Sequence, residues 1–274
     1  MDIRTRIPLN NGTSIPLLGF GVWQAKDGEE TRRAVTWALE TGYRHIDTAA
    51  AYGNEHSVGQ AMRDSGIPRE EIFLTTKLWN EDQRRHNQMK AFEDSLKRLG
   101  TDYVDLYLIH WPVAGVFVES WKVMEEIYKS GRAKAIGVSN FKIHHLETLL
   151  AQAEIVPAAD QMEFNPLMQD NDLLAFCREK GIVFEAWSPL GVGSLTNDQT
   201  TAAIGSKYGK TGPQAILRWI IQKNIPVFPK SVHKERILQN ADIFDFELSP
   251  EDMATIDAMN RNQRSGADPD NFHF

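Results

Sequence analysis

The sequence of 274 residues is 42% hydrophobic and 24% charged, so it can form one large domain or two smaller ones with substantial cores. Its formal net charge of -7 argues against a nucleic-acid-binding surface. Cys177 is the only cysteine, which excludes an intramolecular disulfide and a multi-cysteine metal site. The N-terminal residues lack the apolar core of a signal peptide, and no run approaches membrane-spanning length. We therefore expect a soluble, cytoplasmic protein with neither nucleic-acid nor membrane partners.

The chain opens with a predicted hairpin and then alternates strands with helices. Asn10, Asn11 and Gly12 form a turn signal between two short apolar segments. Eight apolar runs then have the length of buried strands: residues 17–23, 43–46, 72–76, 104–109, 134–138, 157–162, 182–187 and 225–228. Between them, apolar residues recur at a spacing that buries one helix face, as in Ala34, Val35, Ala38 and Leu39; Phe92, Leu96 and Leu99; Leu173, Leu174 and Cys177; and Ala215, Ile216, Trp219 and Ile220.

This alternation predicts an α/β fold, namely a single (β/α)8 TIM barrel preceded by an N-terminal β-hairpin. No linker, low-complexity stretch or internal repeat divides the chain, so we expect residues 1–274 to form one domain. A doubly wound parallel sheet is the main structural alternative, because it is built from the same alternation.

Polar residues follow the predicted strands at the end where a barrel carries its active site. They are Asp47, Lys77, His110, Ser139 with Asn140, Gln161, Trp187 with Ser188, and Lys230 with Ser231. Each also has an ordinary structural role: an Asp can cap a helix, a Lys can end a strand in solvent, and a His or Tyr can pack in the core. Four titratable groups that converge on one rim, Asp47, Tyr52, Lys77 and His110, favour a catalytic site instead.

The chemistry of these four groups suits the reduction of a carbonyl, which needs a hydride at carbon and a proton at oxygen. A phenol has a pKa of about 10, and a nearby ammonium lowers it. Lys77, held by Asp47, would tune Tyr52 as the general acid, and His110 would polarise the carbonyl oxygen.

The usual dinucleotide-binding loop is absent. The segments GFG at 19–21 and GVG at 191–193 both lack the third glycine of the Rossmann fingerprint. This argues against a Rossmann domain but leaves room for a nucleotide bound across a barrel mouth. Near the last predicted strand, Lys230 and Arg236 supply positive charge and Ser231 a hydroxyl, which suit a phosphate. The alternative is that they form the ordinary basic start of a helix.

Five segments resemble signature blocks of the aldo-keto reductases: GYRHIDTAAAYGNE, TTKLW, YLIHWP, IGVSNF and IPVFPKS. The blocks occur in the family's order, and the resemblance runs from the hairpin to the DPDNF tail. The chain looks most like the bacterial 2,5-diketo-D-gluconate reductases. The resemblance implies a monomer that uses NADPH to reduce a small ketone or aldehyde, such as a sugar ketone, a ketoester or a reactive aldehyde. It implies carbonyl reduction because His110 stands where the family's steroid double-bond reductases carry Glu.

Carried over position by position, the resemblance gives these residues their roles. It makes Asp47, Tyr52, Lys77 and His110 the catalytic tetrad. Ser139, Asn140 and Gln161 would hold the nicotinamide carboxamide, Trp187 would stack on its ring, and Ser188 and Leu190 would lie along the pyrophosphate. Lys230, Ser231, Val232, Arg236 and Asn240 would surround the adenosine end, with the cations on the 2′-phosphate of NADPH. Two positions depart from the common pattern: Asp160, where Asn is usual, and His233, where relatives carry a small polar residue or Arg.

Four aromatic residues are expected to line the substrate pocket: Phe20, Trp23, Trp79 and Trp111. Their alternative role is packing in the core. The C-terminal tail, residues 264–274, is predicted to fold over the barrel mouth and to restrict large substrates.

Two other classes of function remain open. One is a nucleotide-binding barrel without activity that serves as a redox-sensing partner subunit. The other is a metal-dependent hydrolase, although His144 and His145 are adjacent rather than on one helix face and no HExxH motif is present. We therefore predict no metal site.

Overall fold

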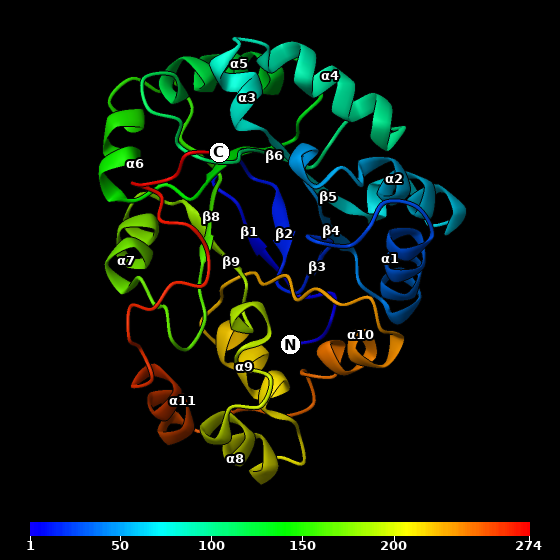
Figure 1. Ribbon diagram of the computed structural model, residues 1–274, viewed down its shortest axis with the longest axis vertical. Coiled ribbons are helices and arrows are strands. Elements are labelled where there is room, and N and C mark those ends of the chain that lie inside the picture. The colour runs from blue at the N-terminus through cyan, green and yellow to red at the C-terminus, as the bar shows by residue number, and fades with distance from the viewer.

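The main sheet of the computed structural model, which describes residues 1–274, contains seven parallel strands in the order of the sequence. They are β3 (Phe20–Gly21), β4 (His45–Asp47), β5 (Phe73–Leu78), β6 (Leu106–Ile109), β7 (Ile136–Ser139), β8 (Ala159–Glu163) and β9 (Val183–Trp187). The helices surround these strands (Figure 1). This sequential order confirms the barrel and excludes a doubly wound sheet, whose strand order reverses at a switch point.

The predicted eighth strand closes the barrel without forming a regular ladder. Val227 lies between the first and the last strands of the sheet. It makes one parallel bridge to Leu18, just before β3, and another to Ala186 in β9. Pro226 and Pro229 flank this residue and have no N–H to donate, so the segment cannot extend the pairing. The prediction of a strand here was therefore correct in place and wrong in its regularity.

The helices carry the apolar stripes predicted from the sequence. They are α1 (Glu29–Thr41), α2 (Glu55–Asp64), α3 (Asn80–Arg84), α4 (Gln88–Leu99), α5 (Phe117–Lys129), α6 (Ile143–Leu150), α7 (Asn171–Glu179), α8 (Gln199–Lys207), α9 (Gly212–Gln222), α10 (Lys234–Ala241) and α11 (Pro250–Asp257). The four predicted stripes fall in α1, α4, α7 and α9, and all are buried. In α9, Thr211 and Gln214 form a capping box that starts the helix. None of the helices is both long and apolar enough to cross a membrane.

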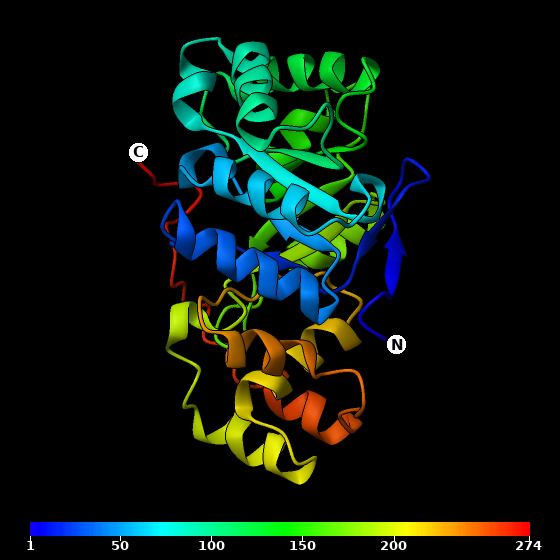
Figure 2. The same cartoon turned by 90° about the vertical axis from the view of Figure 1, so that its right-hand side faces the viewer.

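The two ends of the barrel are covered by different parts of the chain. Strands β1 (Arg6–Pro8) and β2 (Ser14–Pro16) form the predicted hairpin, from which Leu9 and Ile15 pack against Phe73 and Leu106 inside the barrel. Figure 2 shows this hairpin at one end and the C-terminal tail at the opposite end. The hairpin therefore closes the amino ends of the strands, and the carboxyl ends remain for a site.

Candidate active site

A cavity of about 620 Å³ opens at the carboxyl ends of the strands. It brings together most of the predicted site residues: Asp47, Tyr52, His110, Ser139, Asn140, Gln161, Trp187, Ser188, Leu190, Lys230, Ser231, Arg236 and Asn240, with Trp23, Trp79 and Trp111. Residues as far apart in the sequence as Asp47 and Asn240 thus line one cavity. Such convergence is the expected result of closing parallel strands into a barrel.

Three predicted residues do not line the cavity. Lys77 lies beneath its floor, with no exposed surface. Phe20 is a correction: its ring packs edge-on against Tyr43 with centroids 5.8 Å apart, and the residue is buried in the core. Neighbouring strand residues point to opposite faces, and here Gly21 faces the cavity. Val232 packs against the core from the edge of the site.

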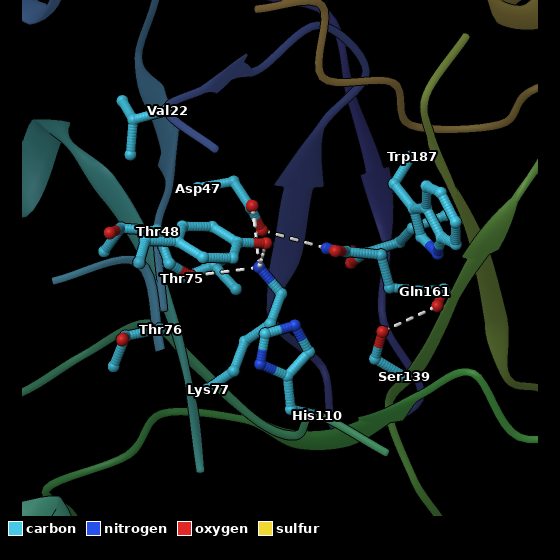
Figure 3. Close-up of polar contacts among 12 residues, drawn as sticks. Val22, Asp47, Thr48, Thr75, Thr76, Lys77, His110, Ser139, Gln161 and Trp187 are labelled. Atoms are coloured by element: carbon cyan, nitrogen blue, oxygen red, sulfur yellow. Dashed lines mark hydrogen bonds and ion pairs between the residues drawn. The ribbon is translucent and has the colours of Figure 1, made fainter. Parts of the chain in front are cut away.

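Lys77 makes three hydrogen bonds inside the barrel. Its Nζ donates to Asp47 Oδ1 at 2.7 Å, to the Thr48 carbonyl at 2.9 Å and to Tyr52 Oη at 3.5 Å. Burial lowers the pKa of Lys77, but the Asp47 carboxylate and Tyr52 outweigh it, so the net pKa is raised. The ammonium therefore stays charged, and its three donors are all used. Figure 3 shows Asp47 between Lys77 and Gln161.

Tyr52 is held at the end of the short 3-10 helix Ala50–Tyr52. Burial raises the pKa of its hydroxyl, the Lys77 ammonium lowers it, and the net shift is upward. Lys77 thus acts in the expected direction, but the sequence could not show that desolvation is larger. Because its pKa is raised, the Tyr52 hydroxyl keeps its proton at neutral pH. The Tyr52 oxygen accepts from Lys77, so the hydroxyl proton can point toward another group.

His110 follows β6 and lies beside Tyr52, with ring centroids 5.6 Å apart. Burial, helped by the Lys77 charge, lowers the pKa of His110 well below its usual value, so the imidazole is neutral. Its Nδ1 is buried without a partner. Nε2 is therefore the nitrogen that remains for a group in the cavity.

Asn140 ties two walls of the site together. Its Nδ2 donates to the His110 carbonyl at 3.0 Å, and its Oδ1 accepts from Trp187 Nε1 at 3.1 Å. The latter bond fixes the indole ring on one side of the cavity. Asn140 and Ser188 both have positive φ angles, 64° and 51°, which is a strained conformation that often occurs at functional sites.

Two cations at the far end of the cavity have no acidic partner in contact. Lys230 follows the closing segment and Arg236 lies in the first turn of α10, and both line the cavity. The start of a helix also attracts anions. Burial lowers the pKa of Lys230, and Glu30 acts against this. This end of the cavity is suited to a phosphate.

The tail closes the other side of the cavity, as predicted. Glu163 at the end of β8 accepts hydrogen bonds from the backbone N–H groups of Ser265 and Gly266, at 2.7 and 3.1 Å. A Cβ on Gly266 would lie 2.4 Å from the Trp187 ring, so only glycine fits there. At the end of the tail, Phe274 stacks on Trp79 with centroids 5.8 Å apart.

The tail also brings His144, His145 and Asp270 together, with their potential ligand atoms all within 4.8 Å of one another. The adjacency of the two histidines in the sequence did not predict this. Lys142 Nζ lies 2.7 Å from Asp270 Oδ2 and 2.7 Å from Asp268 Oδ1. Lys142 pairs with both carboxylates, and His144 Nε2 lies 3.0 Å from Asp270 Oδ1, so the cluster fastens the tail to the start of α6.

Sequence reasoning missed three residues at the site: Glu163, Glu185 and Gly266. Glu185 is fully buried and accepts from Gln161 Nε2 at 2.9 Å. Burial, together with Asp47, raises the pKa of Glu185 to about 8. Its position two residues before Trp187, on the same face of the strand, was the available signal.

The fold and the site define a class of protein. A buried ammonium–carboxylate pair under a protonated tyrosine, beside a neutral imidazole, can donate a proton to an oxygen held in the cavity. Two cations without an acidic partner line the other end of the same cavity, where they suit a phosphate. This combination on a (β/α)8 barrel is that of an oxidoreductase with a nucleotide cofactor.

Comparison with known proteins identifies the family. Residues 17–261 match the model of the aldo/keto reductase family. Glyoxal reductase of Bacillus subtilis is 47% identical over 100% of this chain and 99% of its own, and methylglyoxal reductase DkgA of Escherichia coli is 45% identical over 98% of each. The structure of a Bombyx mori aldo-keto reductase in complex with NADP has a TM-score of 0.92, with 38% identity over 98% of this chain and 97% of that one. The chain belongs to the aldo/keto reductase family and is an oxidoreductase.

Proposed function

We propose that this oxidoreductase uses NADPH to reduce a small aldehyde or ketone to the alcohol, with Tyr52 as the proton donor. The observation that carries the proposal is the contact between Lys77 Nζ and Tyr52 Oη, at 3.5 Å, under a cavity that also contains His110. Tyr52 supplies a proton, Lys77 a charge that stabilises the phenolate left behind, and His110 a hydrogen-bond donor, all around one point of the cavity. A substrate oxygen at that point would be activated from two sides.

In this mechanism the neutral His110 donates from Nε2 to the carbonyl oxygen and orients it. NADPH, when bound, supplies the hydride that the carbonyl carbon receives. Tyr52 gives its proton to the oxygen as negative charge develops there, and the resulting phenolate is stabilised by Lys77. Asp47 keeps Lys77 charged and in place throughout. Solvent then returns a proton to Tyr52.

The residues of the cavity fit the nucleotide along its length. Trp187, fixed by Asn140, offers a flat surface for the nicotinamide ring. Ser188 and Leu190, which follow Trp187 in the chain, line the same cavity, as do Ser231, Arg236 and Asn240. The Lys230 and Arg236 charges favour NADPH, because its 2′-phosphate is the charge that NADH lacks. The relative crystallised with NADP supports this choice.

The space around Tyr52 favours short substrates. Trp23, Trp79 and Trp111 form apolar walls, and Phe274 of the tail stacks on Trp79. The names of two relatives, glyoxal reductase and methylglyoxal reductase, point to dicarbonyls of this size. We therefore place reactive α-dicarbonyls first among the substrates, ahead of ketoesters and of sugar ketones such as 2,5-diketo-D-gluconate.

A panel of these carbonyls, assayed with NADPH and with NADH in the presence of a chelator, tests the proposal. We expect oxidation of NADPH, followed by its absorbance, with the dicarbonyls giving the highest kcat/KM. Nucleotide binding without turnover of any carbonyl would favour the redox-sensing alternative. Loss of turnover in the chelator would favour a metal-dependent reaction.

The choice of cofactor gives a separate prediction. Charge-assisted hydrogen bonds are worth about 1.5–3 kcal/mol, or an affinity change of about 10- to 150-fold. Arg236→Ala should raise the dissociation constant of NADPH by such a factor and leave that of NADH nearly unchanged. Quenching of tryptophan fluorescence measures both constants. Lys234→Ala, which removes an exposed cation of the same helix outside the cavity, is the control. Equal losses for both nucleotides would show that Arg236 supports the adenine or the fold instead.

We also propose that the protein acts as a monomer in the cytoplasm. The four groups of the proposed mechanism all meet within one chain, so the reaction needs no residue from a second copy, and the single cysteine, Cys177, is a buried free thiol, as is usual in a reducing compartment. Sedimentation of the purified protein tests the first point, because a stable dimer at low concentration would contradict it.

A further inference from the structure

Glu185 is a buried carboxyl that the mechanism above does not use. It lies in β9, directly paired in register with Gln161 of β8. Its Oε2 accepts from Gln161 Nε2 at 2.9 Å, and its Oε1 is buried without a partner. A buried carboxyl with an unsatisfied oxygen costs stability. The presence of Glu185 inside the barrel therefore needs a functional explanation that offsets this cost.

The side-chain amide of Gln161 is held between two carboxyl groups. Nε2 donates one hydrogen to Asp47 Oδ2 at 2.9 Å and the other to Glu185 Oε2 at 2.9 Å. Asp47, which pairs with the Lys77 ammonium, presents an acceptor, so the amide nitrogen must face it and the oxygen must face away, while Glu185 Oε2 takes the second amide hydrogen. Gln161 lines the cavity, so its Oε1 is the atom turned toward the nicotinamide end.

The neighbouring polar side chains are already committed to the protein. Asn140 Nδ2 donates to the His110 carbonyl and to Ser139 Oγ, and Asn140 Oδ1 accepts from Trp187. Ser139 Oγ donates to the Gln161 carbonyl at 2.8 Å. Gln161 Oε1 is thus the side-chain oxygen among these three residues that makes no hydrogen bond within the protein.

We infer that Glu185 is a positioning residue for cofactor recognition: with Asp47 it locks the Gln161 amide so that Oε1 accepts a hydrogen bond from the carboxamide NH2 of the nicotinamide. The inference rests on the proposed function, which places the nicotinamide at this end of the cavity. It assigns to Glu185 a role that acts through Gln161 and not through direct contact with the cofactor.

The charge state of Glu185 fits this role. The titratable groups around it are Asp47 of β4, Lys77 of β5 and Asp160 of β8, and burial raises the pKa of Asp160 well above its usual value. With its pKa raised to about 8 by burial and by Asp47, Glu185 is a neutral acid at pH 7. It can therefore accept from Gln161 without placing a second negative charge next to Asp47, which pairs with Lys77.

Two substitutions and three ligands test the inference by binding, without turnover. Glu185→Leu removes the acceptor, whereas Glu185→Gln keeps an acceptor oxygen at the same place. The ligands are NADP⁺, its 3-acetylpyridine analogue, whose acetyl group has no N–H to donate, and 2′-phospho-ADP-ribose, which has no nicotinamide. Calorimetry measures each dissociation constant.

We expect Glu185→Leu to weaken NADP⁺ about 3- to 10-fold, the effect of one neutral hydrogen bond, and to leave the other two ligands unchanged. Glu185→Gln should restore most of this loss. In a Gln161→Leu background, Glu185→Leu should have no further effect on NADP⁺, because the residue through which it acts is gone.

Other results would overturn the inference. Equal weakening of all three ligands would show that Glu185 only supports the fold, as would the same loss in the Gln161→Leu background. An unchanged NADP⁺ affinity in Glu185→Leu would show that Asp47 alone holds the amide. Failure of the proposed function is distinguishable, because the wild-type protein itself would then not bind NADP⁺.

Discussion

Replacing Tyr52 with Phe is expected to reduce turnover by at least about 10²- to 10⁴-fold, the contribution of a positioned general acid, while NADPH still binds. The substitution keeps the ring and removes the proton that the carbonyl oxygen would receive. It also removes the acceptor of the longest of the three Lys77 hydrogen bonds, at 3.5 Å, so the buried ion pair stays intact. Single-turnover oxidation of bound NADPH and the dissociation constant of NADPH measure the two effects separately.

Tyr107→Phe provides a matched control for this experiment. Tyr107 lies in β6, is fully buried, and has a hydroxyl without any hydrogen-bond partner. Its removal therefore costs no bond, and turnover should remain near that of the wild type. If a well-folded Tyr52→Phe enzyme also kept normal turnover, Tyr52 would not be the proton donor.

Replacing Lys77 with Met is expected to damage both turnover and stability. Tyr52 loses the ammonium that stabilises its phenolate, so the loss of turnover should approach that of Tyr52→Phe. Asp47, which is 5% exposed, loses its cation, and breaking a buried ion pair costs about 3–5 kcal/mol of unfolding free energy. Steady-state kinetics and urea unfolding measure these two losses.

The double variant Lys77→Met, Asp47→Asn separates the two roles of the lysine. It removes the uncompensated buried charge, so the unfolding free energy should recover, whereas turnover should not. Recovery of turnover in the double variant would mean that Lys77 serves only to balance Asp47, and that Tyr52 donates its proton unaided.

The gathering of Asp47, Tyr52, Lys77 and His110 at one site could be predicted from the sequence because each of them stands at or just after the end of a predicted strand. A barrel places all such positions at one rim, so an approximate strand assignment was sufficient. The exact limits of the strands were less important: β3 is only two residues long, yet the position of Trp23 at the cavity was correct.

Properties that depend on burial and side-chain direction could not be obtained in the same way. Phe20 was assigned to the pocket because of its place in the sequence, although its neighbour Gly21 faces the cavity. The net rise in the pKa of Tyr52 depends on desolvation, which no list of neighbours reveals. Glu185 was missed because its role depends on the pairing of β8 with β9, which sets it beside Gln161.

The close approach of Gly266 to the Trp187 ring connects two properties of the proposed enzyme, the range of substrates that the tail admits and the affinity for the cofactor. The tail lines the cavity through Gly266, Ala267 and Phe274, and in the proposed function the indole would form the surface for the nicotinamide, so one close approach would join both halves of the reaction. Grafting a different tail onto this barrel to accept bulkier carbonyls would therefore preserve the nicotinamide surface only if the new segment kept a glycine at the crossing point. The C-terminal tail could thus be exchanged as a segment, but the position of Gly266 would have to remain glycine.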